Sequence, residues 1–248
     1  MKKIFLISIL LVFSCFNKTK LSELNEKTLI DNNWKIIINP FTEWEVKFSK
    51  NKKVNFKFST YEDQGIFNGK YHINKEKVLQ ISTIKGHGSA TYINLPKELK
   101  CKLIPMKNSL FYLEKLFCNN KLEIININKK VQDGMTRTFK NTKVVIKNTQ
   151  MKATSNLKLR DMPNLKSKQI TYIYGTKNDP VLLTKFLKRS YIKKDLTVKV
   201  IAKTVSKFKV KKWNNYWYYI SIDSLTQTGP YHSAYSKTYG WVFGEFLK

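Results

Sequence analysis

Residues 42–58 read TEWEVKFSKNKKVNFKF, and this stretch decides the fold class. In both halves apolar residues alternate with polar ones, and a lysine-rich centre separates the halves. The apolar positions are Trp44, Val46, Phe48, Val54, Phe56 and Phe58. Successive residues of a β-strand face opposite sides of a sheet, so the pattern predicts two half-buried antiparallel strands joined by a turn.

Similar short alternations continue as far as residue 147, and turn signals such as Asn68-Gly69 and Asp133-Gly134 separate them. A succession of about eight or more short strands within about 115 residues is typical of an antiparallel barrel or sandwich. We therefore predict an antiparallel β domain, a barrel or a meander, over residues 34–149.

Four blocks follow in the second half of the chain. They are Leu157-Lys-Leu-Arg-Asp-Met-Pro-Asn-Leu-Lys-Ser167, Lys194–Val200, Tyr216–Ile220 and Tyr239-Gly-Trp-Val-Phe-Gly-Glu-Phe-Leu247. In this order they resemble the bacterial SH3 (SH3b) domain. The resemblance implies a small SH3-like barrel over residues 150–248, and hence an all-β protein. It also implies binding of cell-wall peptides or of protein partners in the envelope.

The aromatic third block suggests where a ligand binds. In a strand, Trp217 and Tyr219 face one side, and Tyr218 faces the other. A small barrel has one interior, so one aromatic set is either covered by the long segment 221–238 or open as a recognition surface. Both alternatives remain, and Trp213 would extend an open surface. By analogy with SH3b domains, the expected ligand contacts are Trp217, Tyr219, Tyr239 and Trp241.

A weaker resemblance concerns the first domain. The run Gly65–Ile81 is similar to the glycine–tyrosine hairpin of small lipocalin-like bacterial lipoproteins. It suggests an alternative function, a carrier that holds a small apolar ligand in its barrel. Alternating residues such as Phe56, Phe58 and Tyr71 would line the cavity, or they would simply fill the core.

The first fifteen residues have the layout of a secretory signal. Lys2 and Lys3 precede the apolar run Ile4–Phe13, which is too short for a permanent membrane span. Val12-Phe13-Ser14-Cys15 resembles a bacterial lipobox, which implies removal of residues 1–14 and a lipid on Cys15. A plain cleaved signal is the alternative. Residues 15–33 would form a tether that ends in a short helix and holds the protein at the cell envelope, facing the periplasm or the exterior.

The chain has three cysteines. If Cys15 carries a lipid, Cys101 and Cys118 remain as a pair in an oxidising compartment. They flank two predicted strands with a turn near 105–109, so a hairpin would bring their sulfurs together. We therefore predict a disulfide between them.

The net charge of +29 favours anionic partners such as lipid headgroups or acidic wall polymers. It also admits a second alternative, a basic surface adhesin that binds acidic glycans. Of the 46 basic residues, only Arg137, Arg160 and Arg189 are arginine, and the lysines are scattered, which also fits a bias in genome composition. Nucleic-acid readers depend on the arginine fork, so no nucleic-acid partner is expected.

Nothing in the sequence has the pattern of a catalytic, metal or cofactor site, and we expect a non-catalytic protein without a cofactor. His72, His87 and His232 have no metal-ligand spacing, and no glycine-rich phosphate loop is present. Arg160 lies within an apolar alternation, which indicates an ion pair with a neighbouring carboxylate, either Asp161 or Asp195. A ligand-binding arginine is the alternative.

Overall fold

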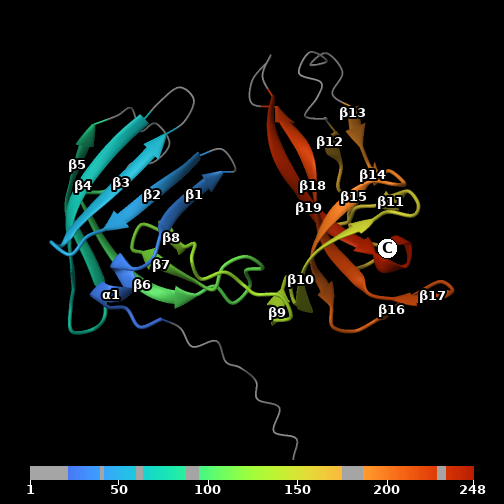
Figure 1. The fold of residues 1–248 in the computed structure, drawn as a ribbon, viewed down its shortest axis with the longest axis horizontal. Helices are drawn as coiled ribbons and strands as arrows, with labels where there is room; N and C mark the ends of the chain where they lie inside the picture. Colours follow the sequence, from blue (N-terminus) through green and yellow to red (C-terminus); the bar gives the residue numbers. More distant parts are fainter. Residues whose placement is uncertain (1–21, 40–41, 60–63, 88–94, 175–186, 228–232) are drawn as a thin grey trace, which may run out of the picture.

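The computed structural model describes residues 22–248, except 40–41, 60–63, 88–94, 175–186 and 228–232. Its regular structure is almost entirely β, with one short α-helix and one turn of 3-10 helix among the described residues. In Figure 1 a barrel and a second sheet stand side by side, joined through the segment that leads into β9 and β10. The predicted all-β class is confirmed.

The first part is a closed barrel of eight antiparallel strands. Each strand pairs with the next along the chain, and β1 closes the barrel by pairing Trp34 with Asn126 of β8. The strands are β1 (Trp34–Asn39), β2 (Thr42–Phe48), β3 (Lys53–Ser59), β4 (Gln64–Ile73), β5 (Leu79–His87), β6 (Glu98–Pro105), β7 (Glu114–Cys118) and β8 (Glu123–Asn126). Of the two predicted forms, barrel or meander, the chain adopts the closed one.

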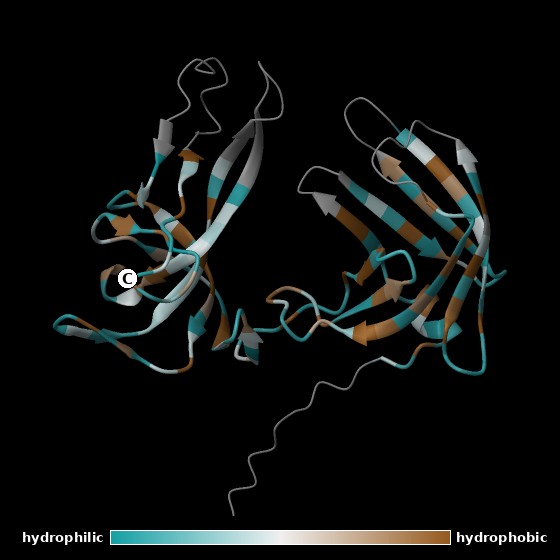
Figure 2. Cartoon of the chain, turned by 180° about the vertical axis from the view of Figure 1, so that it is seen from behind, coloured by the Kyte–Doolittle hydropathy of each residue, from teal (hydrophilic) through white to brown (hydrophobic). Residues whose placement is uncertain are grey.

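The alternating apolar residues of β2 and β3 face the barrel core, as predicted. Trp44 stacks on Phe58 with 4.6 Å between ring centroids, and Phe48 lies edge-on to Tyr71 at 5.2 Å. The interleaved lysines and glutamates face outward, and Figure 2 shows this alternation along the strands. Phe56 is fully buried in the same cluster, so the three residues considered as a cavity lining pack against other side chains.

A short helix, α1 (Glu26–Ile30), covers one end of the barrel. Its Leu29 is buried in the barrel core, and the indole Nε1 of Trp34 donates to the Leu29 carbonyl at 3.0 Å. Ion pairs join Glu26 to Lys52 and Glu23 to Lys77, which stand in the turns after β2 and β4. The short helix predicted within residues 15–33 is therefore present and is docked on the barrel.

The second part is built around a long hairpin of β18 and β19. β18 pairs with β19 on one edge and with β15 and β12 on the other, and the sheet continues from β15 to β10 and β9. Its elements are β9 (Thr136–Phe139), β10 (Thr142–Lys152), β11 (Leu157–Lys158), β12 (Tyr172–Tyr174), β13 (Leu187–Arg189), β14 (Tyr191–Ile192), β15 (Thr197–Thr204), β16 (Phe208–Val210), β17 (Trp213–Asn215), β18 (Trp217–Gln227), β19 (Ser233–Phe243) and the 3-10 turn η1 (Gly244–Phe246).

The boundary between the two parts differs from the predicted one, which lay between residues 149 and 150. The barrel ends with Asn126, whereas β9 and β10 belong to the second sheet. β10 pairs along β15, from Val144 opposite Thr204 to Lys152 opposite Thr197. Strand alternation shows that a segment is a strand but not which sheet it joins, and this is why sequence reasoning assigned β9 and β10 to the first domain.

The second sheet buries apolar residues on both faces. One cluster holds Ile220, Val242 and Leu159, and the other holds Trp217, Tyr219 and their neighbours. The second cluster also contains Leu110 and Val131, which lie in the segments after β6 and β8 of the barrel.

Within the ranges that the structure describes, no helix has the length and apolar character needed to cross a membrane.

Candidate functional site

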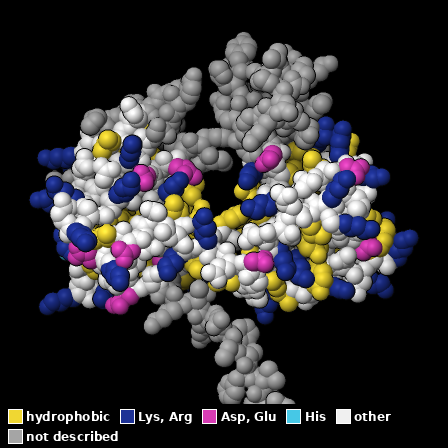
Figure 3. Space-filling model, in the orientation of Figure 1, with side chains coloured by type: hydrophobic (Ala, Val, Ile, Leu, Met, Phe, Trp, Pro, Cys, Tyr) yellow, Lys and Arg dark blue, Asp and Glu magenta, His cyan; other side chains and the backbone are white. Residues whose placement is uncertain are grey.

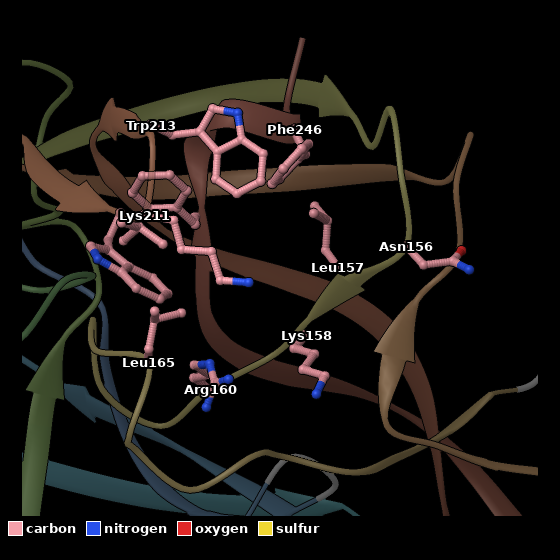
Figure 4. Close-up of a pocket in the computed structure, with 11 residues that line it drawn as sticks. Asn156, Leu157, Lys158, Arg160, Leu165, Lys211, Trp213 and Phe246 are labelled. Atoms are coloured by element: carbon pink, nitrogen blue, oxygen red, sulfur yellow. The ribbon is translucent and has the colours of Figure 1, made fainter.

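A groove of about 210 Å³ opens on the second domain (Figure 4). The strand β11, the β16–β17 hairpin and the start of β18 contribute to it, together with the end of β19 and η1. We call it the aromatic groove, and its lining residues are Asn156, Leu157, Lys158, Arg160, Leu165, Val210, Lys211, Trp213, Trp217, Phe243 and Phe246.

Four aromatic rings form the apolar side of the groove. Trp217 and Phe243 are opposite each other in the β18–β19 register, with ring centroids 5.4 Å apart. Trp213 meets Phe246 edge-to-face at 5.1 Å. Trp217 is only 2% exposed, whereas Trp213 and Phe246 are partly exposed and available to a ligand.

Three cations complete the lining, and no carboxylate is among the groove residues given above. In Figure 4, Lys158 and Arg160 lie at one end, Trp213 and Phe246 lie at the other, and Lys211 extends between them. The groove therefore combines an apolar side made of aromatic rings with three positive charges.

The Arg160 position is fixed by its backbone. Its N–H donates to the Trp241 carbonyl at 2.9 Å, and the Trp241 N–H donates to the Arg160 carbonyl at 2.7 Å. Nη1 of the guanidinium donates to the carbonyl of Ser167 at 2.8 Å. The expected ion pair is not formed: Asp195 pairs with Lys152 at 3.1 Å, and Arg160 has no carboxylate within 4.0 Å among the described residues. A turn carbonyl has taken the role predicted for a carboxylate.

The structure separates the four residues expected to contact a ligand. Only Trp217 lines the aromatic groove. Trp241 is fully buried and Tyr219 is 8% exposed, so of the two alternatives the rings are covered, and their expected role as open ligand contacts is wrong. Tyr239 is half-buried, and its ring is stacked with that of Tyr219 at 6.2 Å.

The cover over Tyr219 and Trp241 also differs from the one expected. The described residues of segment 221–238 extend the β18–β19 hairpin, so they do not fold back over these two rings. Phe139 of β9 lies 4.8 Å from Tyr219, and Leu110 of the barrel joins the same cluster. Burial is the larger cause and the electrostatic effect of the neighbouring Tyr239 is the smaller one, and together they raise the pKa of Tyr219 to about 12. Phe139 comes from the far edge of the same sheet and Leu110 from the barrel, and neither was recognisable as a cover in the sequence.

Sequence reasoning missed Lys211 and Phe246 as groove residues. Lys211 stands at the tip of a tight hairpin in which Val210 pairs with Trp213, and its φ of 53° is left-handed. The lysine–lysine–tryptophan run 211–213 was a usable signal, because an aromatic ring beside cations in a short hairpin is commonly exposed. Phe246 has no such signal, since η1 brings it to the groove.

The remaining predicted sites are distributed as follows. Cys101 and Cys118 form the predicted disulfide and are opposite each other in the β6–β7 register. Cys15 and residues 1–14 lie outside the described residues, as does His232. Among the described residues, no group of three His, Cys, Asp or Glu side chains could hold a metal ion.

The groove combines aromatic rings with three cations. Its lining residues include no histidine, cysteine, serine or carboxylate. Comparisons with family models, with curated proteins and with solved structures find no match to this chain. The residues of the groove are therefore what indicate a function.

Proposed function

We propose that this protein is a non-catalytic binding module of the cell envelope, which holds a cell-wall peptide in the aromatic groove of its second domain. One observation carries the proposal: partly exposed Trp213 and Phe246 meet edge-to-face and line one groove together with Trp217 and three cations. Rigid aromatic side chains bind extended ligands with little loss of conformational entropy.

The SH3b resemblance supports the same ligand class. Its opening block provides Leu157, Arg160 and Leu165, its third block provides Trp217, and its closing block provides Phe243 and Phe246. Residues of three separate blocks thus line one groove. A protein partner in the envelope with an extended segment would use the same contacts.

Retention at the envelope is the second half of the proposal. The signal-like residues 1–14 and the lipobox-like sequence ending in Cys15 support export followed by lipidation. Radiolabelled palmitate should enter the wild-type product and should not enter a Cys15→Ser variant. A wild-type product that takes up no label would overturn the lipid anchor without affecting the groove.

The two alternative functions have weaker support. A carrier needs room inside the barrel, yet Phe56, Phe58 and Tyr71 pack within one continuous cluster. An adhesin that relies on basic charge needs a concentrated patch, whereas Figure 3 shows lysine and arginine side chains spread over both parts of the face in view.

A pull-down on purified cell-wall sacculi tests the binding function. We expect the full chain to be retained and Trp213→Ala to reduce retention about tenfold, as for an aromatic residue at the centre of an interface. Phe208→Ala is the matched control, because Phe208 is 38% exposed on the same hairpin but does not line the groove. Equal retention of both variants, or no retention of the wild type, contradicts the proposal.

A further inference from the structure

We propose that the aromatic groove selects a peptide with a free carboxylate next to an apolar group, and that Arg160 and Lys211 bind this carboxylate. The inference rests on the proposed function and adds the chemical class of the ligand. Lys158 at the same end would strengthen the attraction.

The first argument is unbalanced charge. The lining holds three cations and no carboxylate. The described ion pairs use other basic residues, and those residues are Lys35, Lys47, Lys52, Lys77, Lys115 and Lys152. Three like charges that share a groove repel one another, so an anion that enters it relieves this repulsion and gains attraction from each cation.

The second argument is that Arg160 is already held in place. Its backbone N–H and carbonyl are both hydrogen-bonded to Trp241, and its Nη1 donates to the Ser167 carbonyl at 2.8 Å. A guanidinium has five N–H donors, so most of them remain for a ligand. A fixed arginine loses little side-chain entropy when it binds a carboxylate, which makes each new hydrogen bond more favourable.

The third argument comes from Lys211. The tight Val210–Trp213 hairpin fixes its backbone, and Figure 4 shows its side chain extending from the Trp213 side toward Arg160. A carboxylate between Lys211 and Arg160 would thus be bound from two elements of the domain. Distorting the β16–β17 hairpin would displace Lys211 and so remove one of the two cations that bind the carboxylate.

The apolar walls decide between a peptide and a phosphate polymer. A polyphosphate chain is charged along its whole length and offers no apolar group to pack against Trp213, Phe246 or Leu165. A volume of about 210 Å³ is below the usual range for whole small-molecule sites, so it suits one or two residues of an extended peptide. In a peptide with an acidic group beside an apolar one, the acidic group would lie at Arg160 and Lys211, and the apolar group would lie at Trp213 and Phe246.

The test uses sacculi from which phosphate polymers have been removed with hydrofluoric acid. One portion keeps its carboxylates, and in the other portion a carbodiimide and ammonia convert them to neutral amides. We expect the full chain to bind the carboxylate form about tenfold more tightly than the amide form, as for a hydrogen-bonded charge pair.

Two lysine variants separate the groove from the general charge of the chain. Lys211→Gln and Lys209→Gln each remove one positive charge from an exposed lysine in the same hairpin region, and only Lys211 lines the groove. We expect Lys211→Gln to lose most of the preference for carboxylate sacculi and Lys209→Gln to keep it. Arg160→Gln should behave like Lys211→Gln, with circular dichroism as a check on its folding.

Each other outcome has a distinct meaning. Equal retention on both kinds of sacculi, with Trp213→Ala still defective, overturns carboxylate selection and leaves the proposed function standing. Equal losses for the two lysine variants also overturn it, since long-range charge would then explain the binding. Retention that disappears once phosphate polymers are removed points to phosphate and overturns it. A chain that binds no sacculus at all defeats the proposed function itself.

Discussion

The ring of Phe111, in the segment between β6 and β7 of the barrel, lies edge-on to the ring of Tyr239 on β19, with 5.8 Å between centroids. The preceding Leu110 is buried in the core of the second domain. The guanidinium of Arg137 on β9 donates to the carbonyl of Met106 in the same segment, and burial lowers the pKa of Arg137. This segment of the barrel therefore packs into the aromatic core that also contains Trp217 and Phe243 of the groove.

Leu110→Ala should destabilise the second domain, although Leu110 belongs to the connection between barrel strands. The side chain is 3% exposed, and truncating a buried leucine typically costs about 2–4 kcal/mol through lost burial and the cavity left behind. Urea unfolding followed by tryptophan fluorescence measures the loss. Leu165→Ala makes the same change at a residue that is 45% exposed, and it should cost about 0.5 kcal/mol or less. Equal costs would show that the junction is not packed.

Removing the Cys101–Cys118 disulfide should destabilise the barrel. The bond closes a loop with a sequence separation of 17, which the chain-entropy model equates with about 3 kcal/mol. A double alanine variant, compared with the wild type in urea, measures the difference. A thiol assay on denatured, unreduced Cys15→Ser protein provides the control and should find no titratable group. Two thiols would show that the bond does not form.

Tyr219 should make the folded state less stable at high pH. Burial raises its pKa to about 12 from the ordinary value of 10.0. Between these values the unfolded chain releases the proton and the folded chain retains it, so the free energy of unfolding falls as the pH rises through this window. Denaturation at a series of pH values should show a shallower fall for Tyr219→Phe. Identical slopes for variant and wild type would refute the assignment.

Gly240→Ala should weaken both the fold and the groove. A Cβ at this position would stand 2.6 Å from Cγ of Leu159 and 2.9 Å from the carbonyl oxygen of Arg160. Overpacking of this kind costs about 1–3 kcal/mol, and relief of the clash would displace the segment that carries Arg160. Thermal unfolding and sacculus binding should both decline. Gly69→Ala, where the closest approach is 3.1 Å, should cost less and leave binding unchanged. Unaltered stability of Gly240→Ala would contradict the tight packing described.

The role of Gly240 shows where local sequence reasoning was limited. A glycine often marks a tight backbone turn, yet Gly240 lies within the regular strand β19 opposite Ile220. It is needed because Leu159 and Arg160 approach it from another segment. A glycine signals that something is close or bent, but the sequence does not say which.

The sequence by itself determined the strands, the disulfide and the inward-facing residues of the barrel. These follow from two-residue periodicity and cysteine pairing, which are local or nearly local properties of the chain. Tertiary structure alone decided that β9 and β10 join the second sheet and that Leu110 packs in the same cluster as Tyr219 and Trp241. It also brought Arg160, Lys211 and Phe246 together at one groove. Such contacts join residues far apart in the chain, and no spacing in the sequence records which surfaces meet when the two domains pack.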